Sequence, residues 1–298
     1  MSTGTAESGL VVVDKPAGLT SHGAVARVRR ILGTRKVGHA GTLDPMATGV
    51  LLVGVNRATR LLGHLIVTEK SYAATIRLGV GTLTDDAEGE VTTAPGLAPT
   101  SPDRLEAAMA PLRGGISQVP TAVSAIKVNG VRAYAKVRAG EEVALAARPV
   151  TVSRFDLLDR RDASVEGVAC VDLDVVVDCS SGTYIRALAR DLGAALGSAG
   201  HLTALRRTRV GPFGLDEAQL LTDATTELPL IGMTEVARRC FPVLNVDAAD
   251  EAAVRVGRAL PDHPLTADRV ALLSADEEFL ALYRRRGDAA IPEAVFCG

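Results

Sequence analysis

One carboxylate in this chain stands where a reactive group would be expected, at Asp44 in the Gly-rich stretch of residues 36–52. Its neighbours are small or conformationally restricted, among them Gly38, Gly41 and Pro45. Small residues let a large ligand approach the backbone, and proline holds the preceding residue in an extended conformation. Such a loop suits an ionised carboxylate that acts as a nucleophile on a bound substrate. An Asp-Pro pair is also typical of a helix start, with the aspartate as N-cap.

The segments around Asp44 predict the elements that would hold it in place. Residues 10–14 predict a strand, and the apolar residues 50–55 predict a buried strand. Residues 21–32 predict a helix capped by Ser21, because apolar side chains recur there at helical spacing. Asp44 is therefore expected between a basic helix and a buried strand.

The middle of the chain is rich in long strands. Alternating or continuous apolar residues predict strands at residues 72–78, 150–158 and 168–179. Helices are predicted to begin near Ser101 and after Thr183. Long strands with few helices indicate an α+β protein built on a mixed, largely antiparallel sheet.

Arg186 lies in the first turn of the helix predicted after Thr183, where a cation gains nothing from the helix dipole. Arg186 and Arg190 are one turn apart and share a helix face. A carboxylate partner such as Asp44 would explain the position of Arg186. We therefore predict an ion pair between these two residues.

A basic hairpin is predicted around Asn129-Gly130, because this dipeptide accepts the positive φ angles of a type I′ turn. Its arms carry Lys127 and Arg132, and Tyr134 follows. Cations beside an aromatic ring suit contact with a phosphate backbone and base stacking. An ordinary surface hairpin fits the same residues equally well.

The stretch around Asp44 resembles the catalytic motif of the TruB family, the bacterial tRNA pseudouridine-55 synthases. Every fixed position of the family pattern Gly-His-x-Gly-x-Leu-Asp-Pro-x-Ala-Thr-Gly is filled at residues 38–49. Four further segments resemble motifs of the family in the family's order, at residues 13–21, 70–72, 180–186 and 202–208. Because several ordered motifs are more specific than one, the resemblance covers residues 10 to about 210.

The resemblance implies a pseudouridine synthase fold with a central cleft across the sheet and a small C-terminal β domain of the PUA-like kind. It implies a catalytic domain at residues 9–240 and the small domain at 241–298, divided where the composition changes after Phe241-Pro242. Residues 1–8 are small and polar, and we expect them to be disordered. It also implies roles for seven residues. Asp44 would be the nucleophile, Tyr72 would stack on the uracil, Arg186 would pair with Asp44, and His39, Tyr184, Leu205 and Lys15 would contact the substrate or support the catalytic loop.

The implied reaction breaks the glycosidic bond of uridine 55 in the T-arm of tRNA, turns the base and rejoins it through carbon. This reaction is redox-neutral and transfers no phosphate, so we expect no cofactor and no metal, and the sequence carries no nucleotide-binding or metal-ligand motif. Asp44 could attack the anomeric carbon, add to the uracil ring, or abstract a sugar proton to give a glycal. The residues leave these three routes open.

The charge is distributed unevenly along the chain. The net charge is −2, yet residues 1–60 carry eight Lys and Arg against three acids, and residues 241–298 carry six against ten. A polyanion such as tRNA would therefore meet the N-terminal part. The four cysteines form no Cys-x-x-Cys pair, and no membrane span or signal pattern is evident. We expect a cytoplasmic monomer with reduced thiols and no obligatory protein partner.

Two other functional classes fit part of the sequence. A non-catalytic RNA-binding or tRNA-folding protein of the same fold would share the basic segments, although it would not need Asp44, Tyr72 and Arg186 together. A glycosidase using Asp44 would need a second carboxylate as acid, and none accompanies it in its loop.

Overall fold

The computed structural model describes residues 7–66, 68–121, 127–128, 131–132, 145–261 and 263–297. The chain divides into two compact units. Unit 1 comprises residues 1–43, 50–66 and 211–298, and unit 2 comprises residues 44–49 and 67–210. Most of the segment 1–8, for which disorder was predicted, lies outside the described residues.

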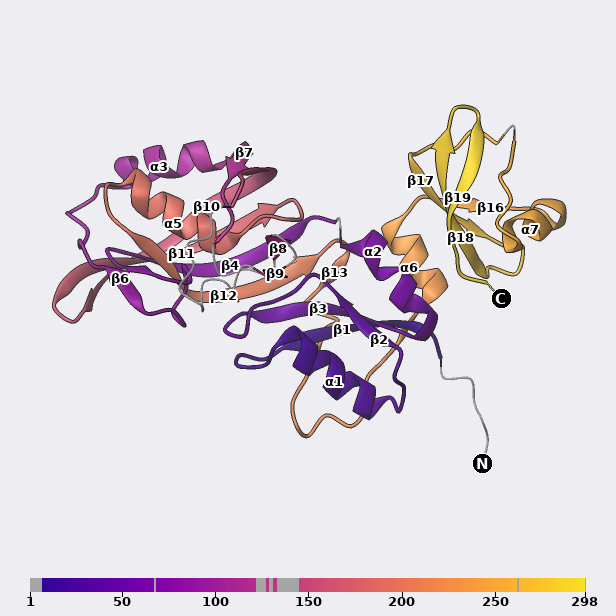
Figure 1. The fold of residues 1–298 in the computed structure, drawn as a ribbon, viewed down its shortest axis with the longest axis horizontal. Helices are drawn as coiled ribbons and strands as arrows, with labels where there is room; N and C mark the ends of the chain where they lie inside the picture. The colour runs from indigo at the N-terminus through magenta and orange to yellow at the C-terminus, as the bar shows by residue number, and fades with distance from the viewer. Residues whose placement is uncertain are drawn as a thin grey trace. The chain divides into compact units, whose positions relative to one another are not determined.

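The first part of unit 1 is built around strand β1, which is buried along almost its whole length, with the apolar run 10–13 and the charged Lys15 both in the interior. β1 pairs in parallel with β14 and antiparallel with β15, and β2 pairs antiparallel with β3. Figure 1 shows helix α1 beside these strands. The elements are β1 (Gly9–Lys15), α1 (Ser21–Ile31), β2 (Val37–Ala40), β3 (Thr48–Val55), η1 (Asn56–Arg60), α2 (Leu62–Leu65), β13 (Phe213–Gly214), β14 (Gln219–Leu220), β15 (Ile231–Gly232) and α6 (Met233–Cys240).

The predicted cap of α1 was wrong by one residue. Thr20 is the N-cap, and its hydroxyl accepts a hydrogen bond from Gly23 N at 2.9 Å. Ser21 is the first helical residue and is buried. Its Oγ donates to Leu43 O at 2.9 Å and accepts from Leu43 N at 2.8 Å, so it ties the helix to the chain just before Asp44. Thr and Ser are both good N-caps, and only this long-range contact decides between them.

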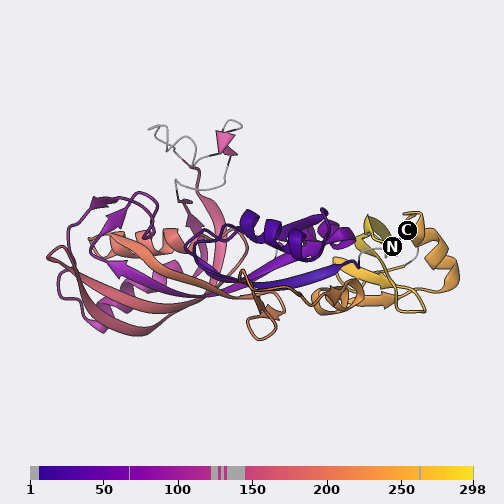
Figure 2. The same cartoon turned by 90° about the horizontal axis from the view of Figure 1, so that it is seen from below.

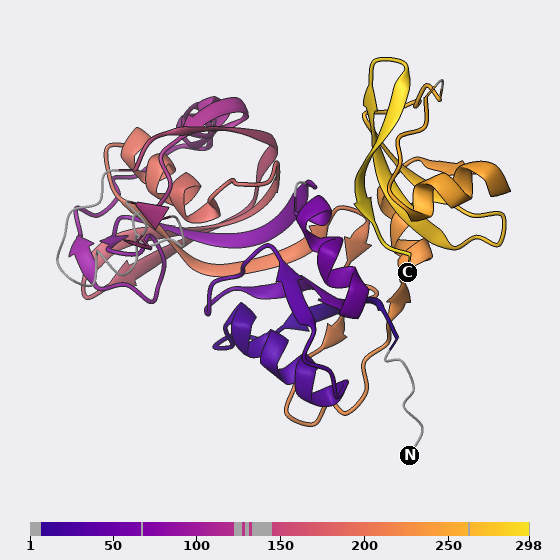
Figure 3. The same cartoon turned by 45° about the vertical axis from the view of Figure 1, so that its right-hand side comes forward.

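The C-terminal part of unit 1 contains a four-stranded sheet, as the turn-rich apolar segments after residue 241 predicted. Its elements are β16 (Val243–Asn245), α7 (Ala248–Arg255), β17 (Arg269–Leu273), β18 (Phe279–Arg286) and β19 (Ala289–Val295). Figure 3 shows α7 beside this sheet. Asp247 caps α7 through bonds to Ala249 N and Asp250 N, a helix that the apolar pattern did not predict. The PUA-like character of this part and its boundary at residue 241 stay predictions.

Unit 2 is an antiparallel sheet in the order β12-β4-β11-β10-β7. Together with the parallel pairs elsewhere, this confirms the α+β class with a mixed, largely antiparallel sheet. The elements are β4 (Lys70–Leu78), β5 (Gly81–Thr82), β6 (Val91–Thr93), α3 (Pro102–Met109), η2 (Ala110–Leu112), β7 (Gly114–Gln118), β8 (Lys127–Val128), β9 (Val131–Arg132), β10 (Arg148–Val165), β11 (Val168–Cys179), α5 (Ile185–Ala195) and β12 (Gly200–Val210).

Strand β4 shows why this sheet has two different faces. Its residues alternate strictly between buried and half-buried, because successive side chains of a strand point to opposite sides. On the outer face, Arg77 pairs with Asp172 of β11 through two bonds of 2.7 Å. On the inner face, Tyr72 and Ile76 are buried. Helix α5 packs against β4 and β12 and lies along the sheet in Figure 2.

Candidate active site

The loop that carries Asp44 is held in unit 2 by a close backbone approach to β12. Thr48 and Gly49 pair in parallel with Arg206 and Arg207. Gly49 has φ +100°, and a Cβ at this position would lie 2.1 Å from Arg207 O. Only glycine fits such a contact, so the glycine five residues after Asp44 has a steric basis.

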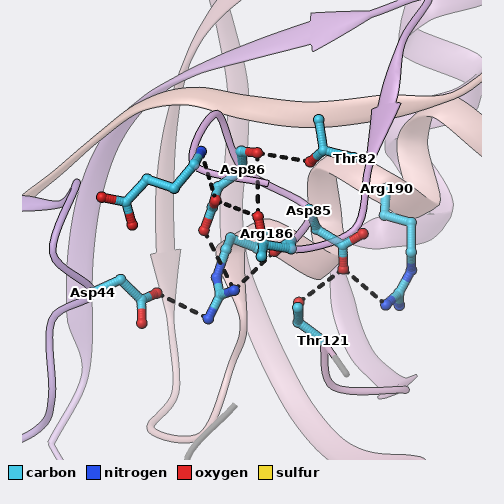
Figure 4. Close-up of polar contacts among 9 residues, drawn as sticks. Asp44, Thr82, Asp85, Asp86, Thr121, Arg186 and Arg190 are labelled. Carbon is cyan, nitrogen blue, oxygen red and sulfur yellow. Dashed lines mark hydrogen bonds and ion pairs between the residues drawn. The ribbon is translucent and has the colours of Figure 1, made fainter. Parts of the chain in front are cut away.

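Arg186 is the centre of the site. It lies in the first turn of α5, and only 7% of its side chain is exposed. Its Nη2 is 3.0 Å from Asp44 Oδ2, so the ion pair predicted from the sequence is present. Its Nη1 lies 3.4 Å from Asp86 Oδ2 and donates to Thr84 O at 2.8 Å (Figure 4). A buried guanidinium thus holds Asp44, of which 36% is exposed, in a fixed orientation.

Asp86 fixes the turn that supports Arg186. Its side chain is 4% exposed, and its Oδ1 accepts from Thr84 Oγ1 at 2.5 Å and from Glu88 N at 3.1 Å. Its carbonyl accepts from Thr82 Oγ1 at 2.7 Å. Because these donors and Arg186 all bind its oxygens, Asp86 acts as an acceptor. It is therefore unsuited to be the second, acidic carboxylate that a glycosidase needs.

A second ion pair lies one helical turn along α5. Arg190 Nη1 is 3.3 Å from Asp85 Oδ2, which also accepts from Thr121 Oγ1 at 2.9 Å (Figure 4). Burial raises the pKa of Asp85, and the charge of Arg190 opposes that rise. Arg190 Nη2 also donates to Val119 O at 2.8 Å. The face shared by Arg186 and Arg190 thus clamps both aspartates of one turn.

Tyr72 is buried on the inner face of β4. Burial is the main cause that raises its pKa, while the charge of Arg207 and a hydrogen bond from it act in the opposite direction. The charge of Asp44 also raises this pKa, so the two groups lie within electrostatic reach of each other. Leu205, also buried, lies opposite Ala74 in the β12–β4 ladder, two residues along from Tyr72. Tyr72, Leu205 and the Asp44–Arg186 pair are therefore all parts of unit 2.

Tyr184 is the N-cap of α5, directly before the turn that carries Arg186. Its backbone is held at both ends by the buried amide of Gln118 on β7. Gln118 Oε1 accepts from Tyr184 N at 2.8 Å, and its Nε2 donates to Tyr184 O at 3.1 Å. Gln118 thereby fixes the start of the helix.

Lys15 and His39 belong to unit 1. The Lys15 side chain is fully buried, and its Nζ donates to Leu19 O at 2.6 Å and to Pro16 O at 3.0 Å. These bonds hold residues 16–19 next to Lys15, and the predicted support of the catalytic loop stays a prediction. His39 is on β2, with its ring edge-on to His22 at 5.5 Å. A contact of either residue with a substrate stays a prediction.

The arms of the predicted basic hairpin pair as expected, with Lys127 opposite Arg132. The turn residues 129–130 and Tyr134 lie outside the described residues, so the turn type and the stacking role stay predictions.

The sequence did not identify Asp85, Asp86, Gln118 and Arg207 as parts of this region. The acidic run Thr84-Asp85-Asp86 before Glu88-Gly89 was a possible signal, since adjacent carboxylates in a turn need partners. Within the described ranges, no group of three or more His, Cys, Asp or Glu side chains is arranged to hold a metal ion. The helices described are also all too short or too polar to cross a membrane.

Two family models and full-length relatives all match this chain to one family of proteins. Residues 29–185 match the N-terminal domain of the TruB family of pseudouridylate synthases, and residues 186–227 match the C-terminal domain of tRNA pseudouridylate synthase B. The tRNA pseudouridine synthase B of Cutibacterium acnes is 59% identical over 284 residues, covering 94% of each chain. That of Nocardia farcinica is 58% identical and covers 95% of this chain and 92% of its own.

Two solved structures share the fold. A Cbf5-Nop10-Gar1 complex contains a chain with a TM-score of 0.70 and 28% identity, covering 97% of this chain and 84% of that one. An H/ACA RNP bound to a substrate RNA containing 2′-deoxyuridine contains one with a TM-score of 0.68 and 26% identity, covering 97% and 85%.

Proposed function

This chain belongs to the TruB family of pseudouridylate synthases, and we propose that it converts uridine 55 in the T-arm of tRNA to pseudouridine with Asp44 as the nucleophile. Membership in the family makes the chain an isomerase.

The ion pair between Asp44 and Arg186 carries this proposal. A nucleophilic carboxylate has to be ionised and correctly aimed when the substrate displaces water from the site. Arg186 supplies a positive charge 3.0 Å from Asp44, and Asp86 and Thr84 O restrain that charge from the other side. Asp44 is exposed enough to meet a ligand, whereas Arg186 is not.

The other residues then receive roles in holding the target base. Tyr72 stacks on the uracil and assists the loss of the proton from carbon 5, and Leu205 and Tyr184 line the same pocket. Extracting a stacked uridine costs a few kcal/mol, and His39 occupies the space that the base leaves. Lys15 keeps the segment that precedes α1 in shape.

Exposed cations of unit 1 support binding to a polyanion. Arg30, Arg35, Lys36, Arg57 and Arg60 are exposed, and within the part of the chain that the structure describes none of the five forms an ion pair. Asn56 N donates to Lys36 O at 2.7 Å, which brings the loop after α1 beside η1. Phosphates would release counterions on binding such a surface. On this basis we propose that these cations bind the phosphates of tRNA. We also propose that the protein acts as a monomer in the cytoplasm, without a protein partner.

The decisive experiment compares wild-type protein with Asp44→Asn and with Asp103→Asn, an exposed aspartate of α3 that serves as the control. Pseudouridine formation in a tRNA transcript is followed by tritium release from carbon 5, and tRNA binding by filter retention. We expect Asp44→Asn to bind tRNA without forming product and Asp103→Asn to behave as wild type. Product from Asp44→Asn would refute the nucleophile. A wild-type protein that binds tRNA without forming product would instead favour the RNA-folding alternative.

The target position needs its own test, in which pseudouridine is mapped by chemical labelling in tRNA from cells lacking the gene. Loss of the modification at position 55 alone is expected. Loss at another position, with 55 unchanged, would refute the assignment.

A further inference from the structure

Arg207 is a fully buried cation to which the roles above give no task. It lies on β12 directly opposite Tyr72 of β4, and its charge and a hydrogen bond from its side chain both lower the pKa of the Tyr72 hydroxyl, against the larger effect of burial. Its neighbours on β12 point to the other face, where Arg206 Nη1 donates to Thr48 Oγ1 at 3.3 Å and Arg209 Nε donates to Ser71 Oγ at 3.1 Å. Arg207 is therefore the one of these three arginines whose side chain lies on the inner face of the sheet.

The surroundings of Tyr72 explain why such a partner matters. The charges of Arg207 on β12, Cys179 on β11 and Asp44 in the loop before β3 all act on the pKa of the Tyr72 hydroxyl. Lys70 lies two residues before Tyr72 on the same face of β4, and burial, then the charge of Arg207, lower its pKa to about 8. Because burial raises the pKa of Tyr72, its side chain is a neutral phenol near pH 7, and a neutral phenol is a weak base.

We propose that Arg207 is a positioning residue for Tyr72, which fixes the phenol oxygen and stabilises the negative charge that develops there when the phenol gives up its own proton, so that Tyr72 can take the proton from carbon 5 of the uracil. This inference rests on the proposed function. A guanidinium has donors and no acceptor, so Arg207 must donate to the phenol oxygen, and the phenol's own hydrogen points elsewhere.

The phenol's own proton first passes to the Asp44 carboxylate, after Asp44 has been released from the substrate, and this leaves a phenolate at Tyr72. The C5–H bond then breaks and its proton bonds to the phenolate oxygen. The electron pair of that bond forms the C5=C6 double bond, and the π pair of the former N1=C6 double bond moves to N1, which takes the proton from Asp44. The positive charge of Arg207 stabilises the Tyr72 phenolate, as preorganised donors stabilise a developing anion.

The test uses Arg207→Gln, Arg207→Lys and the control Arg209→Gln, which removes an arginine from the same strand but from the opposite face. Single-turnover rates on a T-arm stem-loop, RNA affinity and the unfolding transition are measured for each. The chain has four Tyr and no Trp, so tyrosine labelled with carbon-13 at Cζ gives few NMR signals, and Tyr72→Phe identifies that of Tyr72.

We expect Arg207→Gln to lose roughly 100-fold in rate, the scale of one proton-transfer catalyst, with RNA affinity unchanged. Arg207→Lys should recover part of the rate, and the Tyr72 Cζ signal should move in both variants and titrate at higher pH in Arg207→Gln. If Arg207→Gln does not fold, Arg207→Lys and its Cζ signal decide. A wild-type rate in Arg207→Gln, or a slow Arg207 variant with an unmoved Tyr72 signal, would overturn the inference. A wild-type protein without product would overturn the proposed function instead.

Discussion

Arg186 neutralises two aspartates at once, so its replacement by methionine should reduce both stability and catalysis. Asp86 is 4% exposed and would lose its cationic partner. Removing one member of a buried ion pair costs about 3–5 kcal/mol, and we expect the free energy of unfolding to fall by that amount. Asp44 is 36% exposed, and solvent screens it. A charge-assisted hydrogen bond contributes about 1.5–3 kcal/mol, and the exposure of Asp44 favours the lower end of this range for its bond to Arg186. Losing that bond should therefore slow the reaction by at least about 10-fold.

Urea unfolding followed by circular dichroism measures the first effect, and single-turnover kinetics at saturating enzyme measures the second. The matched control is Arg190→Met, one turn along α5, which leaves the buried Asp85 with its bond from Thr121 but touches no part of the Asp44 pair. It should lose stability and keep most of its rate. If Arg186→Met and Arg190→Met slowed the reaction equally, the effect would come from a loosened helix, and the proposed direct role of Arg186 would be wrong.

Four shorter predictions follow from other parts of the structure. Tyr72→Phe should bind RNA normally and turn over slowly, whereas Tyr72→Leu should also lose about 1–3 kcal/mol of stacking; equal affinities of the two variants in a filter assay would contradict the stacking role. A positive φ alone costs a residue other than glycine about 1–3 kcal/mol. Gly49→Ala should lose well over that amount of stability in urea, because the new Cβ would also lie 2.1 Å from Arg207 O. Gly182→Ala, at φ +85° with open space around it, should lose only the backbone cost. The pKa of Lys70 is lowered from 10.5 to about 8, so between pH 8 and 10.5 the unfolded chain binds more protons than the folded protein. The free energy of unfolding of the wild type should therefore rise over this pH range relative to that of Lys70→Met. Parallel plots of unfolding free energy against pH for the two proteins would disprove the shift. A T-arm stem-loop should react much faster than an unpaired control with the same loop sequence, and its binding should weaken with salt; equal single-turnover rates would indicate readout of single-stranded sequence.

Much of the catalytic loop could be predicted from local sequence. Small residues and Pro45 indicated a loop open to a ligand, and the first-turn position of Arg186 indicated a carboxylate partner, which is present at 3.0 Å. Strand positions followed from the apolar pattern, because alternation with a period of two is a local property. The assignment of Thr20 or Ser21 as helix cap was not decidable locally, since both side chains satisfy a helix end equally well.

The tertiary structure alone decided what lies behind these residues. Asp86 forms an ion pair with Arg186. The turn that carries Asp86 is held by a β-bridge to Leu202 of β12, which lies 116 residues later in the sequence. The choice of Arg207 among the arginines of β12 depends on the register with β4, which shifts between Leu202 and Ala204 and again between Arg207 and Arg209. A one-residue change in register sends a side chain to the other face of a sheet. The sequence by itself therefore determined the candidate nucleophile, its loop and the family, because these depend on contiguous residues. The partners that orient the site come from strand register and long-range packing, which no short stretch of sequence contains.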